Sequence, residues 1–239
     1  MSADVSAPSP IISALLSTRA RVASAPAPAP ADDAAEHTIW DMSLVYGELT
    51  PHGFLSLLSS ALLHCRSRAV GALTFLDLGS GEGAPTLLAA AAYPAHWCAL
   101  RGVELVPRLH RLALRHLAEL SSDPAVADAQ AAFSRISFEC DDMLRTDSTW
   151  PSEADVVFIN GTCYSEDILQ QLWHLLEGLR AGAVVMITSH ELPAESGAGK
   201  LLELVAPAAT FDASWGKVTA RVYRRRTGAP RWLAAIKTG

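Results

Sequence analysis

The chain has 239 residues, half of them apolar, and a formal net charge of −6 at pH 7. This length allows one domain of moderate size plus an appendage, with enough apolar residues for a substantial core and no apolar run long enough to span a membrane. The acidic balance argues against general nucleic-acid binding, so any contact with nucleic acid is expected to be local.

The N-terminal segment is rich in alanine, serine and proline and contains the run Ala-Pro-Ala-Pro-Ala-Pro. Such a composition cannot pack a core, so residues 1–35 are expected to form a disordered tail. Arg19 and Arg21, beside the apolar run 11–16, leave an organelle transit peptide open as an alternative, against which Asp4 and the prolines argue. Residues 37–50 show no regular periodicity and are expected to form a loop.

The next informative stretch is residues 73–85, Leu-Thr-Phe-Leu-Asp-Leu-Gly-Ser-Gly-Glu-Gly-Ala-Pro. Its apolar first part favours a buried strand, its three alternate glycines a turn, and the alanine-rich run from Thr86 a helix. This order predicts a nucleotide-binding loop, in which glycine permits both a tight turn and the close approach of a ligand to the backbone.

Asp77 bears on which nucleotide binds. A carboxylate at this strand end would repel the pyrophosphate of a dinucleotide, whereas S-adenosylmethionine carries no phosphate but has an ammonium and a sulfonium. Asp77 therefore favours S-adenosylmethionine. Because Gly79-x-Gly81-x-x-Ala84 also fits the looser dinucleotide pattern, a NAD-dependent oxidoreductase stays open as an alternative.

The remaining apolar patterns alternate between helix and strand. Helices are expected over residues 52–65, with Pro51 at the start, from Pro107 onwards, and over 165–180, where Ser165 is a plausible N-cap. Strands are expected at 97–105, 136–140, 155–160 and 183–188, with two more in 209–223. The order predicts an α/β fold whose mostly parallel sheet has helices on both faces, a central strand at 155–160, and ligands at the strands' C-terminal ends.

Polar residues follow four of these strands: Asp77, Glu104, Asp142 and Asn160. Glu104 stands where a ribose diol is bound, which suits either cofactor. Asp142 can accept a hydrogen bond from an adenine amino group, and Met143 can cover the ring face. Each acid alone could be a helix cap or a solvated charge, but three in register favour a ligand site. Asn160 could cap a turn, or accept from an amine and donate to a carboxylate where cofactor and nucleophile meet.

The four cysteines are far apart and show no ligand spacing, so no metal site is visible. They are expected to be reduced and buried, in an intracellular protein. They are Cys65, Cys98, Cys140 and Cys163.

Five segments occur in a telling order: Val-Tyr-Gly-Glu at 45–48, Phe-Leu-Asp-Leu-Gly-Ser-Gly-Glu-Gly at 75–83, Gly-Val-Glu at 102–104, Asp-Val-Val-Phe-Ile-Asn at 155–160, and Ser-Trp-Gly at 214–216. Together they resemble the non-SET histone-lysine methyltransferases of the disruptor-of-telomeric-silencing family. The Tyr-Gly-Glu segment is more specific than the glycine loop, which many methyltransferases share. The resemblance covers roughly residues 40–224 and places a Dot-one-like domain at 36–228 and a short tail at 229–239.

The resemblance implies a seven-strand, Rossmann-like class I methyltransferase fold that uses S-adenosylmethionine. It implies that Tyr46 and Glu48 fold over the methionine end of the cofactor and that Asn160 lies by the transferring methyl group, so these three are the catalytic candidates. The remaining cofactor contacts implied are Asp77, Gly79, Ser80, Gly81 and Gly83 at the loop, Glu104 at the ribose, and Asp142 and Met143 at the adenine.

Some features depart from the family. Ala84 stands where members often have glutamine, Gly161 stands where a second asparagine often follows, and the long helical N-terminal region of larger members is not seen. No histidine lies in the motifs as an obvious base, so the proton of the attacking amine is expected to leave to water.

The resemblance also implies a protein substrate, with a histone or nucleosome as the candidate, and a location in the nucleus, with cytoplasm or an organelle as alternatives. A non-histone protein substrate, and a cofactor-binding module without its own activity, stay open. The basic stretch 221–231 could contact DNA weakly through Arg224, Arg225 and Arg226, or be a solvated strand.

Overall fold

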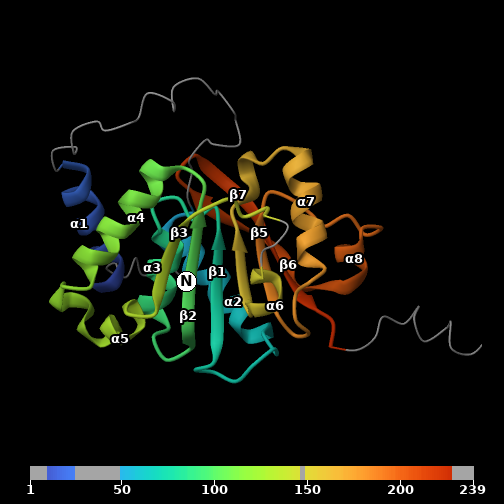
Figure 1. Ribbon diagram of the computed structural model, residues 1–239, viewed down its shortest axis with the longest axis horizontal. Helices are drawn as coiled ribbons and strands as arrows, with labels where there is room; N and C mark the ends of the chain where they lie inside the picture. The colour runs from blue at the N-terminus through green and yellow to red at the C-terminus, as the bar shows by residue number, and fades with distance from the viewer. Residues whose placement is uncertain (1–9, 25–48, 146–148, 228–239) are drawn as a thin grey trace, which may run out of the picture.

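The computed structural model describes residues 10–24, 49–145 and 149–227 (Figure 1). Its centre is one seven-stranded sheet in the order β3-β2-β1-β4-β5-β7-β6. The first five strands run parallel, β7 is antiparallel to β5, and β6 is antiparallel to β7. The strands are β1 Leu73–Leu78, β2 Trp97–Glu104, β3 Ile136–Cys140, β4 Val156–Ile159, β5 Val184–Thr188, β6 Leu202–Ala213 and β7 Gly216–Arg225. The predicted α/β class, the seven strands and the central position of β4 are confirmed.

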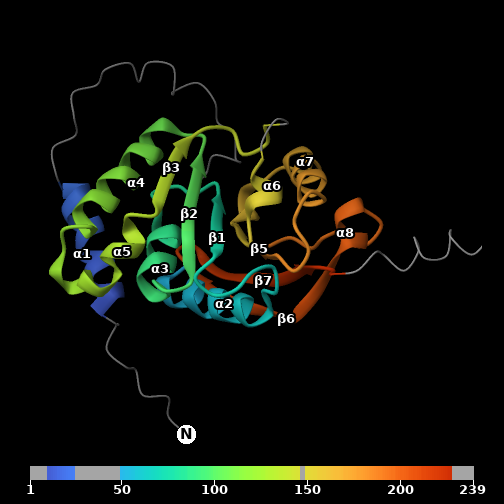
Figure 2. The same cartoon turned by 60° about the horizontal axis from the view of Figure 1, so that its bottom comes forward.

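Helices cover both faces of the sheet (Figure 2). Side chains alternate along a buried strand, so Phe75 of β1 packs into the core beneath α2 and α3, while Leu76 packs into the opposite core beneath α7. The described helices are α1 Pro10–Ser24, α2 Pro51–His64, α3 Ala84–Ala92, α4 Pro107–Leu120, η3 Pro124–Ala129, α5 Gln130–Phe133, α6 Trp150–Glu153, η4 Gly161–Cys163, α7 Glu166–Leu176 and α8 Gly197–Leu201.

The expectation that residues 1–35 are a disordered tail is wrong for Pro10–Ser24, which form α1. This helix packs against α4 and α3 through a buried face that includes Ala14, Leu15 and Thr18. Arg19 reaches Glu82 of the glycine turn at 3.1 Å. Average composition concealed this helix because its short apolar face is flanked by proline-rich sequence.

Two element boundaries differ from the expected ones. α7 begins after the predicted N-cap Ser165, whose hydroxyl accepts from the backbone N–H of Ile168, but it ends at Leu176. β6 begins at Leu202 instead of near residue 209. Its pairing with β7 shifts register twice between Leu204 and Ala209, and these irregularities break the alternation by which a strand is recognised in a sequence.

The expectation that all four cysteines are buried is wrong for three of them. All are free thiols, but only Cys65 is buried; Cys98 and Cys140 are exposed and Cys163 is half-buried. Cys140 ends β3, an edge strand that has a neighbour on one side only. In the part of the chain that the structure describes, no helix is long and apolar enough to cross a membrane, and no His, Cys, Asp and Glu cluster could hold a metal ion.

Candidate functional site

The predicted glycine turn lies at the C-terminal edge of the parallel strands. Leu78, the last residue of β1, pairs with Val103 of β2 on one side and Ile159 of β4 on the other. After it, the N–H groups of Gly79 and Ser80 both donate to the Val103 carbonyl, at 2.9 and 3.0 Å. The turn therefore folds over the end of β2 and comes next to Glu104.

The three glycines of the turn all have left-handed backbone angles, with φ of 75°, 55° and 84° at Gly79, Gly81 and Gly83. A Cβ at Gly83 would lie 2.6 Å from the ring of Phe138 in β3 and 3.0 Å from Ala113 in α4. The missing side chain of Gly83 thus makes room for helix–strand packing. Its predicted contact with the cofactor gains no support from this geometry.

Glu104 is buried at the end of β2, and its two carboxylate oxygens accept from the N–H of Gly81 at 2.7 Å and of Val106 at 2.8 Å. It therefore holds the glycine turn and the start of α4 in place through charge-assisted bonds. A carboxylate has about four acceptor positions. Two remain, which fits the predicted role of binding the two hydroxyls of a ribose.

Asp77 and Ser80 are buried in the same region. Asp77 accepts from the Thr86 hydroxyl at 3.0 Å, which ties the end of β1 to α3. The Ser80 hydroxyl has no hydrogen-bond partner among the described residues. A buried hydroxyl without a partner is costly, so this atom fits a loop that is completed by a polar ligand group. The donor and acceptor set of the turn fits S-adenosylmethionine; the individual contacts stay predictions.

Asp142 and Met143 lie in the loop after β3 and line a pocket of ≈ 190 Å³ together with Arg101 and Trp150. Asp142 is exposed, and one of its oxygens accepts from the N–H of Leu144 at 2.8 Å. Met143 is half-buried. The predicted contacts of both residues with adenine stay predictions.

Tyr164 is a residue of this region that sequence reasoning missed. Its hydroxyl donates to the Leu78 carbonyl at 3.2 Å, lies 3.8 Å from the Met143 sulfur, and fills the space beside Gly79. Burial, then the nearby Glu104 and Asp77 carboxylates, raises the pKa of Tyr164 far above its ordinary value. The phenol therefore stays protonated and acts as a donor. No sequence signal pointed to it, because the short η4 turn alone brings this ring back over β1.

Asn160 follows β4, and its side chain is fixed by hydroxyl groups. Its oxygen accepts from Thr188 at 2.7 Å and from Thr162 at 3.3 Å, and Thr162 lies 2.9 Å from the Ser189 hydroxyl. No side-chain cap of η4 is formed, so the alternative of a capping role is wrong. Sequence reasoning missed these partners because Thr188 and Ser189 belong to the next strand and its loop.

The structure thus brings together at one edge the predicted residues Asp77, Gly79, Ser80, Gly81, Glu104 and Asn160, with Asp142 and Met143 in the adjoining loop. Tyr46 and Glu48 lie outside the described residues.

Comparison with solved structures shows which fold this is. The chain superposes on yhhF from Escherichia coli, which carries a methyltransferase name, with a TM-score of 0.53 and 16% identity, covering 74% of this chain and 87% of that one. TrmN from Thermus thermophilus superposes with a TM-score of 0.52 and 19% identity, covering 74% of this chain and 49% of TrmN. The rRNA methyltransferase aviRa from Streptomyces viridochromogenes superposes with a TM-score of 0.50 and 16% identity, covering 80% of this chain and 92% of aviRa. The class I methyltransferase fold is therefore confirmed. No curated protein matched the chain.

The family follows from a sequence model. The model described as histone methylation protein DOT1 matches residues 39–216, which is most of the chain. This match confirms the predicted resemblance and makes S-adenosylmethionine the expected cofactor in place of NAD. The chain belongs to the DOT1 family, and it is an S-adenosylmethionine-dependent methyltransferase with a Rossmann-like class I fold.

Proposed function

We propose that this methyltransferase transfers its methyl group to the side-chain amine of a protein lysine, and that the substrate is a histone, at a core lysine of the nucleosome. The observation that carries the proposal is the position of Asn160. It follows β4, directly beside the end of β1 from which the glycine turn departs, and two hydroxyls fix its amide. The DOT1 family supports the histone.

Methyl transfer is an in-line displacement, in which a neutral amine attacks the methyl carbon on a sulfonium. Catalysis is then mostly positioning, with the nitrogen held about 3 Å from the methyl and on the axis of the breaking bond. The glycine turn and Glu104 hold the cofactor in this proposal, and Asn160 borders the reacting groups. Tyr46 and Glu48 are proposed to close over the methionine end.

The basic stretch near the C-terminus does not support a DNA contact. Arg224 binds Glu203 of β6 at 2.7 Å, Arg226 binds the same carboxylate at 3.1 Å, and Arg225 donates to the backbone carbonyls of Leu179 and Leu201. Burial lowers the pKa of Arg225 from its ordinary value. The guanidinium groups of these three residues are thus engaged in contacts within the sheet and its neighbours. A nuclear location is proposed on the family alone.

The test is incubation with labelled S-adenosylmethionine and one of three substrates: recombinant nucleosomes, free core histones, or cell extract. Label on a histone lysine is the expected result. Label confined to non-histone proteins would replace the histone by another protein substrate. If the chain binds S-adenosylhomocysteine but labels none of the three substrates, it would be a cofactor-binding module without its own activity.

Asn160→Ala tests the position of the reacting groups. We expect turnover to fall by about 100-fold with at most a small loss of S-adenosylhomocysteine affinity, because the amide acts where the methyl is transferred. The matched control is Gln170→Ala on the exposed side of α7. Equal losses in turnover and affinity would assign Asn160 to cofactor binding only.

A further inference from the structure

The segment after β5 folds back towards Asn160 through an unusual turn. Ser189 has φ of 66° and is the one non-glycine residue with a positive φ among the described residues. The N–H of His190 donates to the Thr188 carbonyl at 2.8 Å, which closes a three-residue γ-turn of the rarer, strained hand. Strain of this kind persists where surrounding contacts hold it, and it often occurs at functional sites.

The turn places the His190 ring against Gly161, the residue next to Asn160. The ring nitrogen Nε2 lies 2.8 Å from the Gly161 carbonyl, and a Cβ at Gly161 would lie 3.1 Å from the ring carbon Cδ2. Because a carbonyl oxygen can only accept, Nε2 carries the hydrogen. In the neutral imidazole, Nδ1 therefore has a free lone pair. Nδ1 makes no hydrogen bond within the described residues, and His190 is half-buried rather than enclosed.

The hydroxyl network occupies the Asn160 oxygen, which was expected to accept a hydrogen bond from an amine. Both acceptor positions of its oxygen are used, by the Thr188 and Thr162 hydroxyls. Of the side chains around Gly161, the imidazole has a ring nitrogen that can accept a proton.

We propose that His190 is the residue that accepts the proton of the substrate amine in methyl transfer. This inference rests on the proposed function. The substrate ammonium gives a proton to Nδ1; the neutral nitrogen then attacks the methyl carbon and forms the N–C bond. The S–C bond breaks with its electron pair going to sulfur, which yields S-adenosylhomocysteine and a methylated ammonium, and the imidazolium returns its proton to water.

Charged and titratable groups surround His190 on two sides. Arg221 of β7 donates to the His190 carbonyl at 3.3 Å and pairs with Glu191 at 3.2 Å, so these two charges balance each other. From the η4 side comes Tyr164, whose ring borders Gly161 as the His190 ring does. The pKa of Tyr164 is raised, so its phenol is not a competing base near neutral pH.

The first test needs no protein substrate. Sinefungin carries an amine in place of the transferable methyl group, so its ammonium can donate to Nδ1, whereas S-adenosylhomocysteine has no group there. We expect His190→Gln to raise the Kd of sinefungin about tenfold by calorimetry and to leave the Kd of S-adenosylhomocysteine unchanged. His174→Gln, on the exposed face of α7, is the matched control and should change neither.

Each outcome of this test decides something. An unchanged sinefungin Kd in His190→Gln, or an equal loss for both ligands, overturns the assignment of His190. Failure of the unaltered chain to bind either ligand overturns the proposed function, and this inference with it.

The second test is a pH profile with free core histones. A general base contributes about 100-fold or more, and lysine amines lose their proton spontaneously towards pH of about 10. The turnover of His190→Gln should therefore be about 100-fold below that of the unaltered enzyme at about pH 7.5 and approach it at about pH 9.5. A deficit that stays constant with pH would show a structural role instead.

Discussion

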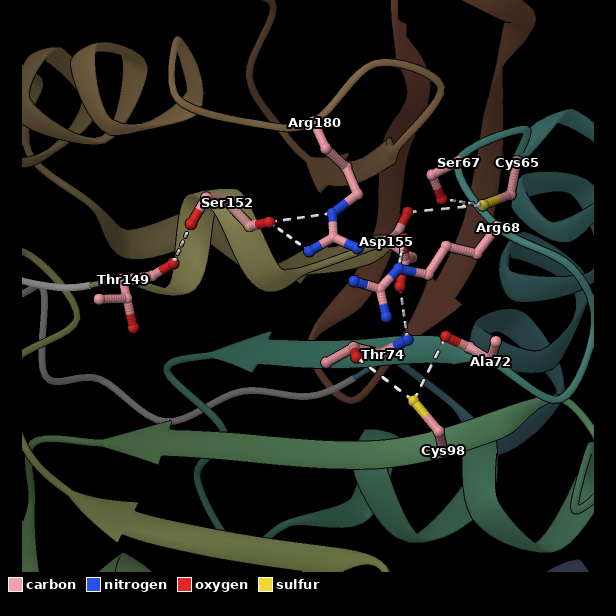
Figure 3. Close-up of polar contacts among 10 residues, drawn as sticks. All are labelled: Cys65, Ser67, Arg68, Ala72, Thr74, Cys98, Thr149, Ser152, Asp155 and Arg180. Carbon is pink, nitrogen blue, oxygen red and sulfur yellow. Dashed lines mark hydrogen bonds and ion pairs between the residues drawn. The ribbon is translucent and has the colours of Figure 1, made fainter.

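Two buried carboxylates at opposite ends of the sheet show how differently the same group can be used. Glu104 lies at the C-terminal end of β2, where two backbone N–H groups bind it and no cationic side chain pairs with it among the described residues. Asp155 lies at the other end, just before β4, and is fully buried. It accepts from the N–H of Thr74 at 2.8 Å and pairs with Arg180 at 3.4 Å and Arg68 at 3.8 Å (Figure 3).

The Asp155 site joins several elements. Figure 3 shows Arg180 extending between Asp155 and the Ser152 carbonyl of α6, which accepts from its Nε at 2.9 Å. The Cys65 thiol, after α2, donates to the Asp155 carbonyl at 3.6 Å. Because two arginines balance its charge, Asp155 is a structural residue. Within the described part of the chain Glu104 has no such cation and retains acceptor positions, so it suits a ligand. The surroundings, and not the carboxylate, decide the role.

The largest effect is expected from a change in the glycine turn beside Glu104. Gly81→Arg should abolish S-adenosylhomocysteine binding in calorimetry, because a side chain there displaces the backbone N–H that binds Glu104 and fills the ligand's space. Gly216→Arg is the control, since Gly216 also has a positive φ but nothing lies within 4 Å of its Cβ position. It should cost about 1–2 kcal/mol of stability and keep binding. Unchanged binding in Gly81→Arg would refute the loop assignment.

At the other end of the sheet, Asp155→Ala should lower the free energy of unfolding by about 3 kcal/mol, because it leaves the Thr74 N–H without its acceptor and removes the charge that balances Arg180 and Arg68. The Kd of the folded protein for S-adenosylhomocysteine should not change. Denaturant unfolding and calorimetry measure the two quantities. Asp212→Ala removes an exposed pair with Lys217 and should cost less than about 1 kcal/mol. A higher Kd for S-adenosylhomocysteine in Asp155→Ala would show that Asp155, like Glu104, contributes to ligand binding.

Glu104→Gln should show the opposite pattern to Asp155→Ala. We expect the Kd of S-adenosylhomocysteine to rise about tenfold to 100-fold, which is about 1.4–2.8 kcal/mol, because a neutral amide accepts weaker hydrogen bonds from hydroxyls. The free energy of unfolding should fall less in Glu104→Gln than in Asp155→Ala. The fully exposed Glu195→Gln is the control. A large loss of stability with unaltered affinity would make Glu104 a purely structural residue like Asp155.

The smallest effect concerns pH. His116 of α4 is buried, its Nδ1 donates to the Glu82 carbonyl in the glycine turn at 3.0 Å, and burial lowers its pKa from 6.5. In the unfolded chain the imidazole takes up a proton near pH 6.5, whereas in the folded protein it does so only at lower pH. Its contribution to stability is therefore complete above pH 6.5 and is lost as the pH falls from 6.5 through the lowered value.

The measurement is Tm against pH for the unaltered chain and His116→Gln. Tm of the unaltered chain should fall more steeply below pH 6.5 than that of the variant, and the exposed His174→Gln should follow the unaltered chain. If Tm changes with pH in the same way in all three proteins, His116 does not contribute to the pH dependence of stability.

Much of this site could be predicted because its signals are local. The sequence of strand, glycines and helix at 73–85 depends on backbone freedom that glycine alone has, and the left-handed angles of Gly79 and Gly81 confirm it. Glu104 and Asn160 were predictable because parallel strands end at one edge. By contrast, Tyr164 and His190 carry no local signal, since the short η4 turn sets the direction of Tyr164 and the turn after β5 sets that of His190.

The sequence by itself determined the fold class, the family and the edge of the sheet at which the site forms, because hydrophobic periodicity, glycine and strand-end acids act over a few neighbouring residues. The tertiary structure decided what each polar group does there. It placed Asp155 with two arginines and Glu104 with backbone amides, and it gave Asn160 its hydroxyl partners from β5. Those roles depend on charges and hydrogen bonds between residues far apart in the chain, which only folding brings into contact.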